Sequence, residues 1–489
     1  RFITRLAACG LAARRNRDKA MQYYSTRGQD GPLGYEEALL SGLARDGGLY
    51  LPEAWPKFSH EDIAAMQGLS YAELAGRLMA PFCFGEIDEA ELTAMARDAY
   101  ADFDHPDIAP LKPLQGNLHV LELFHGPTIA FKDYAMQFLA RAFDRALKKK
   151  QQHAVIVGAT SGDTGSAALE AFKGRDAVDV FILFPEGRVS PVQQRQMTSV
   201  IADGAHAVSV AGDFDDCQAI VKALFNDLAF RDQVNLSAIN SINWARLMPQ
   251  IVYYFAAALR LGAPTQSVAF SVPTGNFGNV FAGYVAVQMG LPVDRLIIAS
   301  NQNDILPRFF ASGAMARESV VPSLSPSMDI QVSSNFERLL FELLDRDGQA
   351  TASVMRQFAE TGQFHVDDSV LARAKQLFSA YRLDDDGTIA EIAATAKNNH
   401  MVIDPHSAVG VYAARQAHGD GTVADDVPIV ALACAHPAKF DAAVTKATGV
   451  APGLPPHLAD LMQRPERQRH VAATADAVKS LVLEMKRGA

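Results

Sequence analysis

Runs of consecutive apolar residues alternate with helix-length segments from about residue 114 to residue 450. Polar positions are rare within the runs, which is typical of strands buried on both faces of a parallel sheet. The pattern therefore predicts an α/β fold in which parallel sheets are flanked by helices. The predicted strands are Ala154–Val157, Val178–Phe184, Ala207–Val210, Val268–Val272, Arg295–Ala299 and Val427–Ala433.

Residues 21–100 have a different pattern, in which apolar residues recur at helical spacing between turn residues. It predicts helices at Tyr35–Leu43, Ser70–Met79 and Asp88–Ala99. Three prolines within Asp102–Pro113 indicate a linker. We therefore expect a mainly helical N-terminal domain over residues 21–100, a core of two α/β subdomains over residues 101–455, and a helical tail over residues 456–489.

Two glycine-rich loops each lie between a predicted strand and a predicted helix. The first is Gly158–Gly165, before the helix Ser166–Phe172, and the second is Thr274–Asn279. Free N–H groups at a helix N-terminus can bind an anion. The first loop is not a P-loop, because Asp163 and Thr164 stand where Lys and Ser/Thr would follow the glycines. Either loop alone is as well explained by an ordinary strand-to-helix turn.

A single lysine, Lys132, lies in the apolar segment Glu122–Tyr134 and directly follows Ala130 and Phe131. Apolar surroundings favour the free amine, which attacks carbonyl groups. The alternative is a lysine at the start of the helix Tyr134–Leu147 with its head group in water. One reactive lysine and two anion sites together suit a cofactor that carries both an aldehyde and a phosphate.

The composition narrows the class of protein. A formal charge of −10 argues against nucleic acid as a partner. The four cysteines, Cys9, Cys83, Cys217 and Cys434, are far apart and form no Cys-x-x-Cys motif, so we expect neither a disulfide framework nor a metal site. Their spacing fits a reducing compartment, the cytoplasm. No apolar run is long enough to span a membrane.

The first twenty residues carry six basic residues and one acidic residue. An arginine-rich, acid-poor leader can be an organelle transit peptide, but this one contains no serine. We expect residues 1–20 to be a disordered leader or upstream sequence, and a targeting segment remains the alternative.

Six motifs occur in one order along the chain: HGPTIAFKD (125–133), GATSGDTG (158–165), NSINWARL (240–247), VPTGNFGN (272–279), DPHSAVG (404–410) and AHPAKF (435–440). Their order and spacing resemble those of the threonine synthase family in its bacterial and fungal form, from about residue 21 to residue 450. The resemblance implies a fold-type II pyridoxal-phosphate enzyme with an N-terminal cap domain. It implies conversion of O-phosphohomoserine and water to threonine and phosphate, the last step of threonine biosynthesis.

The resemblance also implies roles for individual residues. Lys132 would hold pyridoxal 5'-phosphate covalently and then move protons of the substrate. The cofactor phosphate would lie in a cradle formed by Gly275, Asn276, Phe277, Gly278 and Asn279. The substrate would be held by Thr160, Ser161, Gly162 and Thr164, and its phosphate would be bound by Asn240 and Arg246.

Asp163 and Arg246 each have two interpretations. Asp163 could contact the cofactor's ring hydroxyl or could cap the helix from Ser166 onward. Arg246 could be a surface residue on a helix Ile242–Leu261, although that helix is otherwise apolar.

Cys434 departs from the family pattern, because the residue before Ala-His-Pro is usually a threonine that contacts the pyridine nitrogen. A thiol is a weak donor and acceptor, so the contact would be softened. The alternative is a small buried residue at a strand end. His125, His406 and His436 are as well explained by structural roles as by catalytic ones.

Two other functions remain as alternatives: another fold-type II activity of the threonine/serine dehydratase kind, and a catalytically silent homologue that binds a phosphorylated ligand. We expect a monomer with a small-molecule substrate, and a homodimer remains open.

Overall fold

The computed structural model describes residues 20–160 and 162–487. The predicted leader therefore lies almost entirely outside the described residues. Residues 20–100 form a small helical unit around a two-stranded antiparallel sheet of β1 (Tyr23–Ser25) and β2 (Tyr50–Pro52). Its helices are α2 (Tyr35–Ser41), α3 (His60–Ala64), α4 (Tyr71–Met79) and α5 (Glu89–Ala99).

Three of these helices, α3, α4 and α5, begin one residue after a capping side chain. Ser70 accepts a hydrogen bond from the amide of Glu73, and Asp88 accepts one from the amide of Glu91. Such caps satisfy amides that have no partner within the helix. The predicted helices are confirmed, with Ser70 and Asp88 as caps and not as first residues.

A six-stranded sheet has the strand order β13-β10-β9-β14-β4-β3, and only the edge pair β3–β4 is antiparallel. Its face toward α19 (Pro405–Gly419) is lined by Ala269, Ile297 and Ala431, while the alternate positions face the central core. The strands are β3 (Leu111–Pro113), β4 (Leu118–Glu122), β9 (Val268–Pro273), β10 (Val293–Ser300), β13 (Phe378–Arg382) and β14 (Ile429–Ala433).

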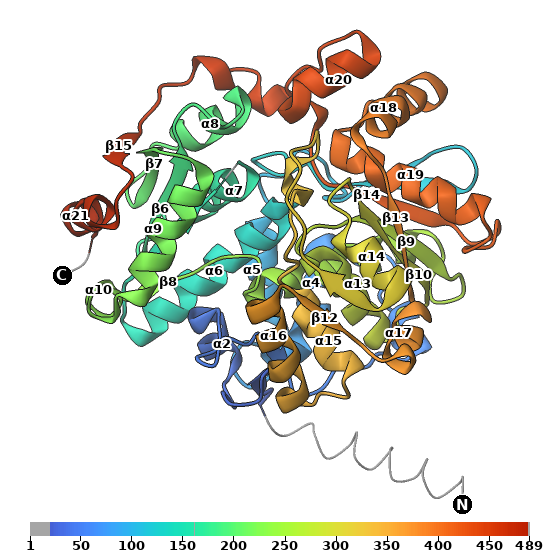
Figure 1. Ribbon diagram of the computed structural model, residues 1–489, viewed down its shortest axis with the longest axis horizontal. Helices are drawn as coiled ribbons and strands as arrows, with labels where there is room; N and C mark the ends of the chain where they lie inside the picture. The colour runs from blue at the N-terminus through green and yellow to red at the C-terminus, as the bar shows by residue number, and fades with distance from the viewer. Residues whose placement is uncertain (1–19, 161, 488–489) are drawn as a thin grey trace, which may run out of the picture.

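A second, five-stranded parallel sheet has the order β15-β7-β6-β5-β8. Its edge strand β15 comes from the C-terminal tail, so the tail predicted to be helical also contains a strand. The strands are β5 (Ala154–Ala159), β6 (Val178–Pro185), β7 (Ala205–Ala211), β8 (Leu236–Ser237) and β15 (Arg469–Ala472). The predicted α/β architecture with parallel sheets and flanking helices is thus confirmed (Figure 1).

Helices cover both faces of each sheet. A short pair, β11 (Ala314–Ala316) and β12 (Gln363–His365), lies in an insertion before β13. The helices not yet named are α6 (Lys132–Lys150), α7 (Asp163–Phe172), α8 (Pro191–Thr198), α9 (Phe214–Asn226), α10 (Leu228–Val234), α11 (Trp244–Leu247), α12 (Ile251–Arg260), α13 (Gly278–Gln288), α14 (Ile305–Ser312), α15 (Phe336–Leu343), α16 (Gly348–Thr361), α17 (Asp368–Lys375), α18 (Asp385–Asn399), α20 (Asp441–Thr448) and α21 (Ala475–Met485). Among the described residues, no helix has the length and apolarity that a bilayer crossing requires.

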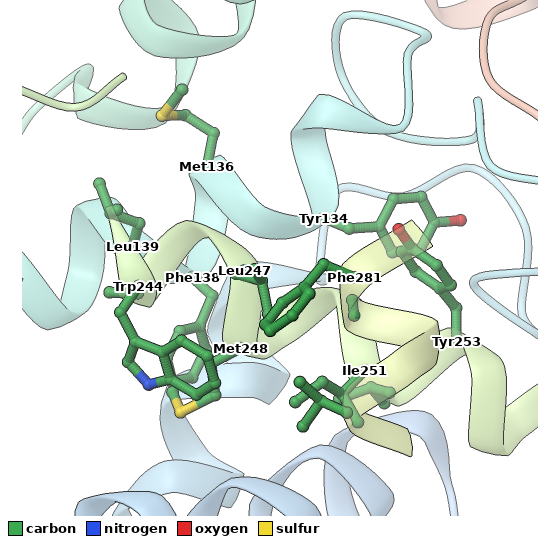
Figure 2. Close-up of a cluster of buried hydrophobic side chains, with 14 of the residues drawn as sticks. Tyr134, Met136, Phe138, Leu139, Trp244, Leu247, Met248, Ile251, Tyr253 and Phe281 are labelled. Carbon is green, nitrogen blue, oxygen red and sulfur yellow. The ribbon is translucent and has the colours of Figure 1, made fainter. Parts of the chain in front are cut away.

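The central core joins the two sheets through α6, α11, α12 and α13. Figure 2 shows side chains of α6, including Phe138, beside Trp244 of α11, Ile251 of α12 and Phe281 of α13. All four are essentially inaccessible to solvent. Because α6 begins at Lys132, this core fixes the position of the lysine relative to both sheets.

Candidate functional site

The segment Ile129–Phe131 is hydrogen-bonded to the chain that follows β14. The amide of Phe131 donates to the carbonyl of Cys434 at 2.8 Å, and the amide of His436 donates to the carbonyl of Ile129 at 3.0 Å. The two motifs HGPTIAFKD and AHPAKF are therefore paired as backbone. This pairing places Lys132 beside Cys434 at the carboxyl end of the six-stranded sheet, where sites form in parallel sheets.

The Lys132 side chain points to a buried carboxylate. Its Nζ lies 3.4 Å from Oδ2 of Asp163, and the lysine side chain is 12% exposed. The interpretation of Lys132 as a lysine with its head group in water is therefore wrong.

Asp163 is the first residue of α7, and its helix cap is Gly162. The interpretation of Asp163 as a cap is wrong, because the helix begins at Asp163 itself and the carboxylate points away from the helix amides toward lysines. Oδ1 lies 2.8 Å from Nζ of Lys439 and accepts a hydrogen bond from Nε2 of Gln193 at 2.7 Å.

Burial by itself would raise the pKa of Asp163, but the ammonium groups of Lys439 and Lys132 and the amide of Gln193 hold it well below its usual range. The carboxylate is ionised at neutral pH. The sequence interpretation missed both Lys439 and Gln193. Lys439 could have been noticed as the basic residue of the AHPAKF motif, whereas Gln193 lies in no motif.

The loop before α7 is held in shape by the hydroxyl of Thr160, one of its own residues. Oγ1 of Thr160 accepts hydrogen bonds from the amides of Gly162 and Gly165, each at 3.0 Å. This hydroxyl therefore shapes the loop. Thr164 is half-buried in the first turn of α7, and Ser161 lies outside the described residues.

The loop Gly275–Asn279 follows β9 and runs into the first turn of α13, whose amides lack partners within the helix. Phe277 has a positive φ of 65°. A Cβ added to Gly275 would lie 2.8 Å from the carbonyl oxygen of Ser327, so only glycine fits there. Nδ2 of Asn279 is buried and has no hydrogen-bond partner in the protein. Free amides and an unpartnered amide group in a tight loop fit a phosphate.

Asn335, just before α15, holds this loop and the NSINWARL segment together. Its amide donates to the carbonyl of Asn276 at 3.0 Å, and its Nδ2 donates to the carbonyl of Ser241 at 3.1 Å. Its Oδ1 accepts from the buried guanidinium of Arg338. Asn335 and Arg338 lie outside every motif, and no sequence signal indicated them.

Arg246 is a buried arginine on α11 without a carboxylate partner among the described residues. One guanidinium nitrogen donates to the carbonyl of Ile239 at 3.1 Å, and Nε has no partner. Burial lowers the pKa of Arg246 to about 10. The interpretation as a surface residue is wrong, because Arg246 is 5% exposed. Asn240, by contrast, is exposed.

The predicted continuous helix over residues 242–261 is also wrong. The segment consists of α11, a 3₁₀ turn at Met248–Gln250 and α12. Pro249 lies in the turn, where its missing N–H costs an α-helical hydrogen bond. Within this segment, Gln250 donates to the carbonyl of Arg246 at 2.7 Å and accepts from Tyr253 at 3.0 Å. The Tyr253 hydroxyl also lies 2.7 Å from Oδ1 of Asn279, which links Arg246 to the glycine loop.

Cys434 is buried directly after β14. Its amide donates to Oγ of Ser407 at 3.2 Å, and its sulfur makes a long contact of 3.8 Å with the carbonyl of Leu432. Burial raises the pKa of the Cys434 thiol, and the charges of Asp404 and Asp163 add to this effect. The thiol therefore stays protonated.

The three histidines all have partners that explain their positions. His125 lies between Asp104 (2.6 Å) and Glu122 (3.0 Å); burial disfavours its cation, yet these hydrogen bonds raise its pKa. His406 is hydrogen-bonded to Asp404 at 2.6 Å. His436 accepts a hydrogen bond from the amide of Ala438 at 3.2 Å and so caps the short helix Pro437–Phe440.

Two largely parallel sheets, with a lysine at a helix start and a glycine loop after β9 at the carboxyl end of the same six-stranded sheet, are typical of one class of enzyme, the fold-type II pyridoxal-phosphate enzymes. A family model described as "Pyridoxal-phosphate dependent enzyme" matches residues 108–369. Two more specific models flank it, "Threonine synthase N terminus" over residues 22–100 and "Threonine synthase, C-terminal" over residues 407–482.

Individual relatives agree with these models. A threonine synthase of Pseudomonas aeruginosa is 53% identical over 91% of this chain and 95% of its own length. The solved structure of a threonine synthase of Brucella melitensis, described as PLP-bound, matches with a TM-score of 0.93 and 53% identity over 96% of this chain and all of that chain. The structure of the yeast enzyme matches with a TM-score of 0.90 and 38% identity over 95% of this chain and 98% of that chain. The chain belongs to the threonine synthase family, and its cofactor is pyridoxal 5'-phosphate.

Proposed function

We propose that this enzyme converts O-phospho-L-homoserine and water to L-threonine and phosphate. The observation that carries the proposal is that the described residues offer two separate candidate anion sites in addition to Lys132. The amides of Gly275–Asn279 form one site, and the unpaired guanidinium of Arg246 forms the other. A cofactor phosphate needs only one of them, so the second site supports a substrate that carries its own phosphate.

The residues present fit the cofactor. Lys132 is the attachment point for its aldehyde, and the loop Gly275–Asn279 holds its phosphate through backbone amides and Nδ2 of Asn279. Asp163 and Cys434 flank Lys132 and are assigned to the ring hydroxyl and the ring nitrogen. When bound, the cofactor acts as an electron sink for negative charge at the substrate's Cα.

The chain's own residues then hold the substrate and move its protons. The amine of Lys132, once free, takes protons from the substrate's Cα and Cβ as a general base. We assign the amino-acid part of the substrate to the loop Thr160–Thr164. Arg246, helped by Asn240 and Thr164, binds the phosphate and stabilises the charge that develops on the leaving oxygen.

The compartment belongs to the same proposal. Three described cysteines, Cys83, Cys217 and Cys434, are buried and unpaired. Unpaired thiols support a reducing compartment, so we place the enzyme in the cytoplasm.

The test is a single assay with two products. Purified enzyme is incubated with O-phosphohomoserine, and phosphate and threonine are quantified together, with Lys132→Ala as the inactive control. Equal amounts of the two products support the proposal. Phosphate with 2-oxobutyrate in place of threonine would identify a dehydratase-like activity, and binding without either product would identify a silent homologue.

A further inference from the structure

Asp163 has two lysine partners, and they are not equivalent. Lys439 contacts Oδ1 at 2.8 Å, and its side chain is fully inaccessible to solvent. Lys132 contacts Oδ2 at the longer distance of 3.4 Å and is partly exposed. The Lys439 ammonium also donates to the carbonyl of Thr128 at 2.8 Å. Lys439 is therefore the fixed partner of the carboxylate, and Lys132 is the looser one.

Lys439 also connects three parts of the site. It lies on the short helix Pro437–Phe440 after β14, whereas Asp163 begins α7 beside the five-stranded sheet, and Thr128 precedes α6. A single ammonium group thus holds the carboxylate in one place relative to the start of α6.

The neighbouring ionisable groups do not replace Lys439. Asp133, the next buried carboxylate, is hydrogen-bonded by the amide and the hydroxyl of Thr128 at 2.8 and 2.6 Å and has no ion pair with either lysine. The thiol of Cys434 stays protonated. Gln193 donates to the same oxygen as Lys439 but carries no charge.

The charge balance has a chemical consequence for Lys132. A lysine attacks a carbonyl only as the free amine. If Lys132 were the only cation beside Asp163, loss of its proton would leave a buried carboxylate without a counterion, which is strongly unfavourable. With Lys439 in place, loss of that proton leaves a neutral pair of Lys439 and Asp163.

We propose that Lys439 is a positioning residue, the standing counterion of Asp163 that allows Lys132 to react as a free amine. This rests on the proposed function only in taking Lys132 as the attachment point of the cofactor.

The test measures the reactivity of Lys132 in the full-length chain freed of cofactor. The probe is formaldehyde with cyanoborohydride at pH 8, and methylation of Lys132 is quantified by mass spectrometry relative to the exposed Lys173 of the same molecule. In Lys439→Met we expect the relative rate at Lys132 to fall by about tenfold, because the amine must now compete with an unpaired carboxylate for its proton. Lys439→Arg keeps the charge and should stay within about twofold of the wild type.

Two further variants separate charge from structure. Gln193→Met removes a neutral hydrogen bond to the same oxygen and should change the rate by less than about twofold, since one neutral bond contributes little net energy. The double variant Lys439→Met with Asp163→Asn removes both charges and should restore the rate to near the wild-type value.

Three outcomes would overturn the proposal: a wild-type rate in Lys439→Met, an equal fall in Gln193→Met, or no restoration in the double variant. If Lys439→Met does not fold, as judged by circular dichroism, the labelling rate of Lys132 in the single variant Asp163→Asn tests the proposal. Its Lys132 should label at least as fast as in the wild type, and a slower rate refutes the proposal. Because the probe is neither the cofactor nor the substrate, these results are independent of the threonine assay.

Discussion

At the scale of single residues, two buried charges of the site, those of Asp163 and Arg246, differ in how many partners they have. Asp163 has two ammonium groups and an amide within hydrogen-bonding distance, so its charge is balanced before any ligand binds. Arg246 has one carbonyl partner and an unpartnered Nε. A buried cation without a counterion is unfavourable in the free protein, and an anionic ligand would remove that penalty.

Arg246→Met should lower kcat/KM for O-phosphohomoserine by roughly ten- to over a hundred-fold, because a hydrogen bond to a charged group contributes about 1.5–3 kcal/mol. Cofactor affinity should be unchanged, because the glycine loop is separate. The melting temperature of the free protein should not fall, since an unpaired buried charge is removed. Steady-state kinetics, a cofactor titration and a melting curve provide the three measurements.

Arg260→Met is the matched control for Arg246→Met. It removes a guanidinium from the far end of α12, where Arg260 contacts the carbonyl of Ala109, outside the site. Its kcat/KM should stay near that of the wild type. Loss of cofactor in Arg246→Met, or equal kinetics in the two variants, would remove Arg246 from the substrate site.

At the scale of elements, two segments hold the site in place, one outside the sequence motifs and one within AHPAKF. The N-terminal end of α15 holds the phosphate loop through Asn335 and Ser333, whose hydroxyl donates to the carbonyl of Gly275 at 2.6 Å. The short helix Pro437–Phe440 places Lys439 and is capped by His436. Both elements act on the site through side chains: the amide of Asn335 and the hydroxyl of Ser333 in one case, and the ammonium of Lys439 in the other.

Asn335→Ala should weaken cofactor binding by about five- to tenfold, because it removes a side-chain hydrogen bond of about 1 kcal/mol to Ser241 and leaves Arg338 with one acceptor fewer. The dissociation constant is measured by the absorbance of the bound cofactor. Ser334→Ala is the control, since half-buried Ser334 makes only a 3.4 Å contact with Asn276. Equal cofactor affinity in the two variants would show that the side chain of Asn335 does not support the loop.

The stability of the helix Pro437–Phe440 should depend on pH through His436. Burial and the neighbouring His125 lower the pKa of His436 from 6.5 to about 4. Between these values the unfolded chain binds a proton and the folded chain does not, so stability falls as the pH decreases from about 6.5 to about 4. The full shift corresponds to on the order of 3 kcal/mol.

His436→Asn keeps a capping side chain but cannot titrate. Its urea midpoint should therefore fall less than that of the wild type between pH 7 and pH 5. The variant also loses the ring contact between His436 and Phe124. Because each protein is compared with itself at the two pH values, this loss does not affect the comparison. Parallel decreases in the two proteins would contradict the prediction.

At the scale of the whole molecule, the C-terminal tail completes the five-stranded sheet. Strand β15 pairs with β7, and Val478 and Val482 of α21 are fully buried against residues of β5, β6 and α9. This sheet thus combines strands between residues 154 and 237 with a strand from the C-terminal tail. Figure 1 shows the red β15 and α21 beside the green strands.

Val482→Asp should lower the melting temperature strongly, because it buries a carboxylate among apolar side chains and costs several kcal/mol. Leu483→Asp, at the next position of the same helix, is the control, since Leu483 is 40% exposed. Differential scanning calorimetry compares the two. Similar melting temperatures would mean that α21 contributes little to the fold.

Part of the order of helices and strands could be predicted from the sequence because periodicity, caps and glycine turns are local signals, but strands such as β4, β8 and β13 were not predicted. All six predicted strands are present, with bounds shifted by a few residues. The helix over residues 242–261 was mispredicted, since its apolar pattern continues through Pro249 although the backbone does not. Strand β15 was missed because the short segment RHVA becomes a strand only by pairing with β7.

The sequence by itself determined the fold class, the family and the position of Lys132, because each depends on motifs that are contiguous in the chain. Only the tertiary structure decided the partners of Lys132 and Arg246. Asp163 faces two lysines because the carboxyl ends of both sheets meet there, and Arg246 is buried because α11 packs between α6 and α13. Contacts between distant segments follow from how the sheets and helices dock, and no local pattern specifies that docking.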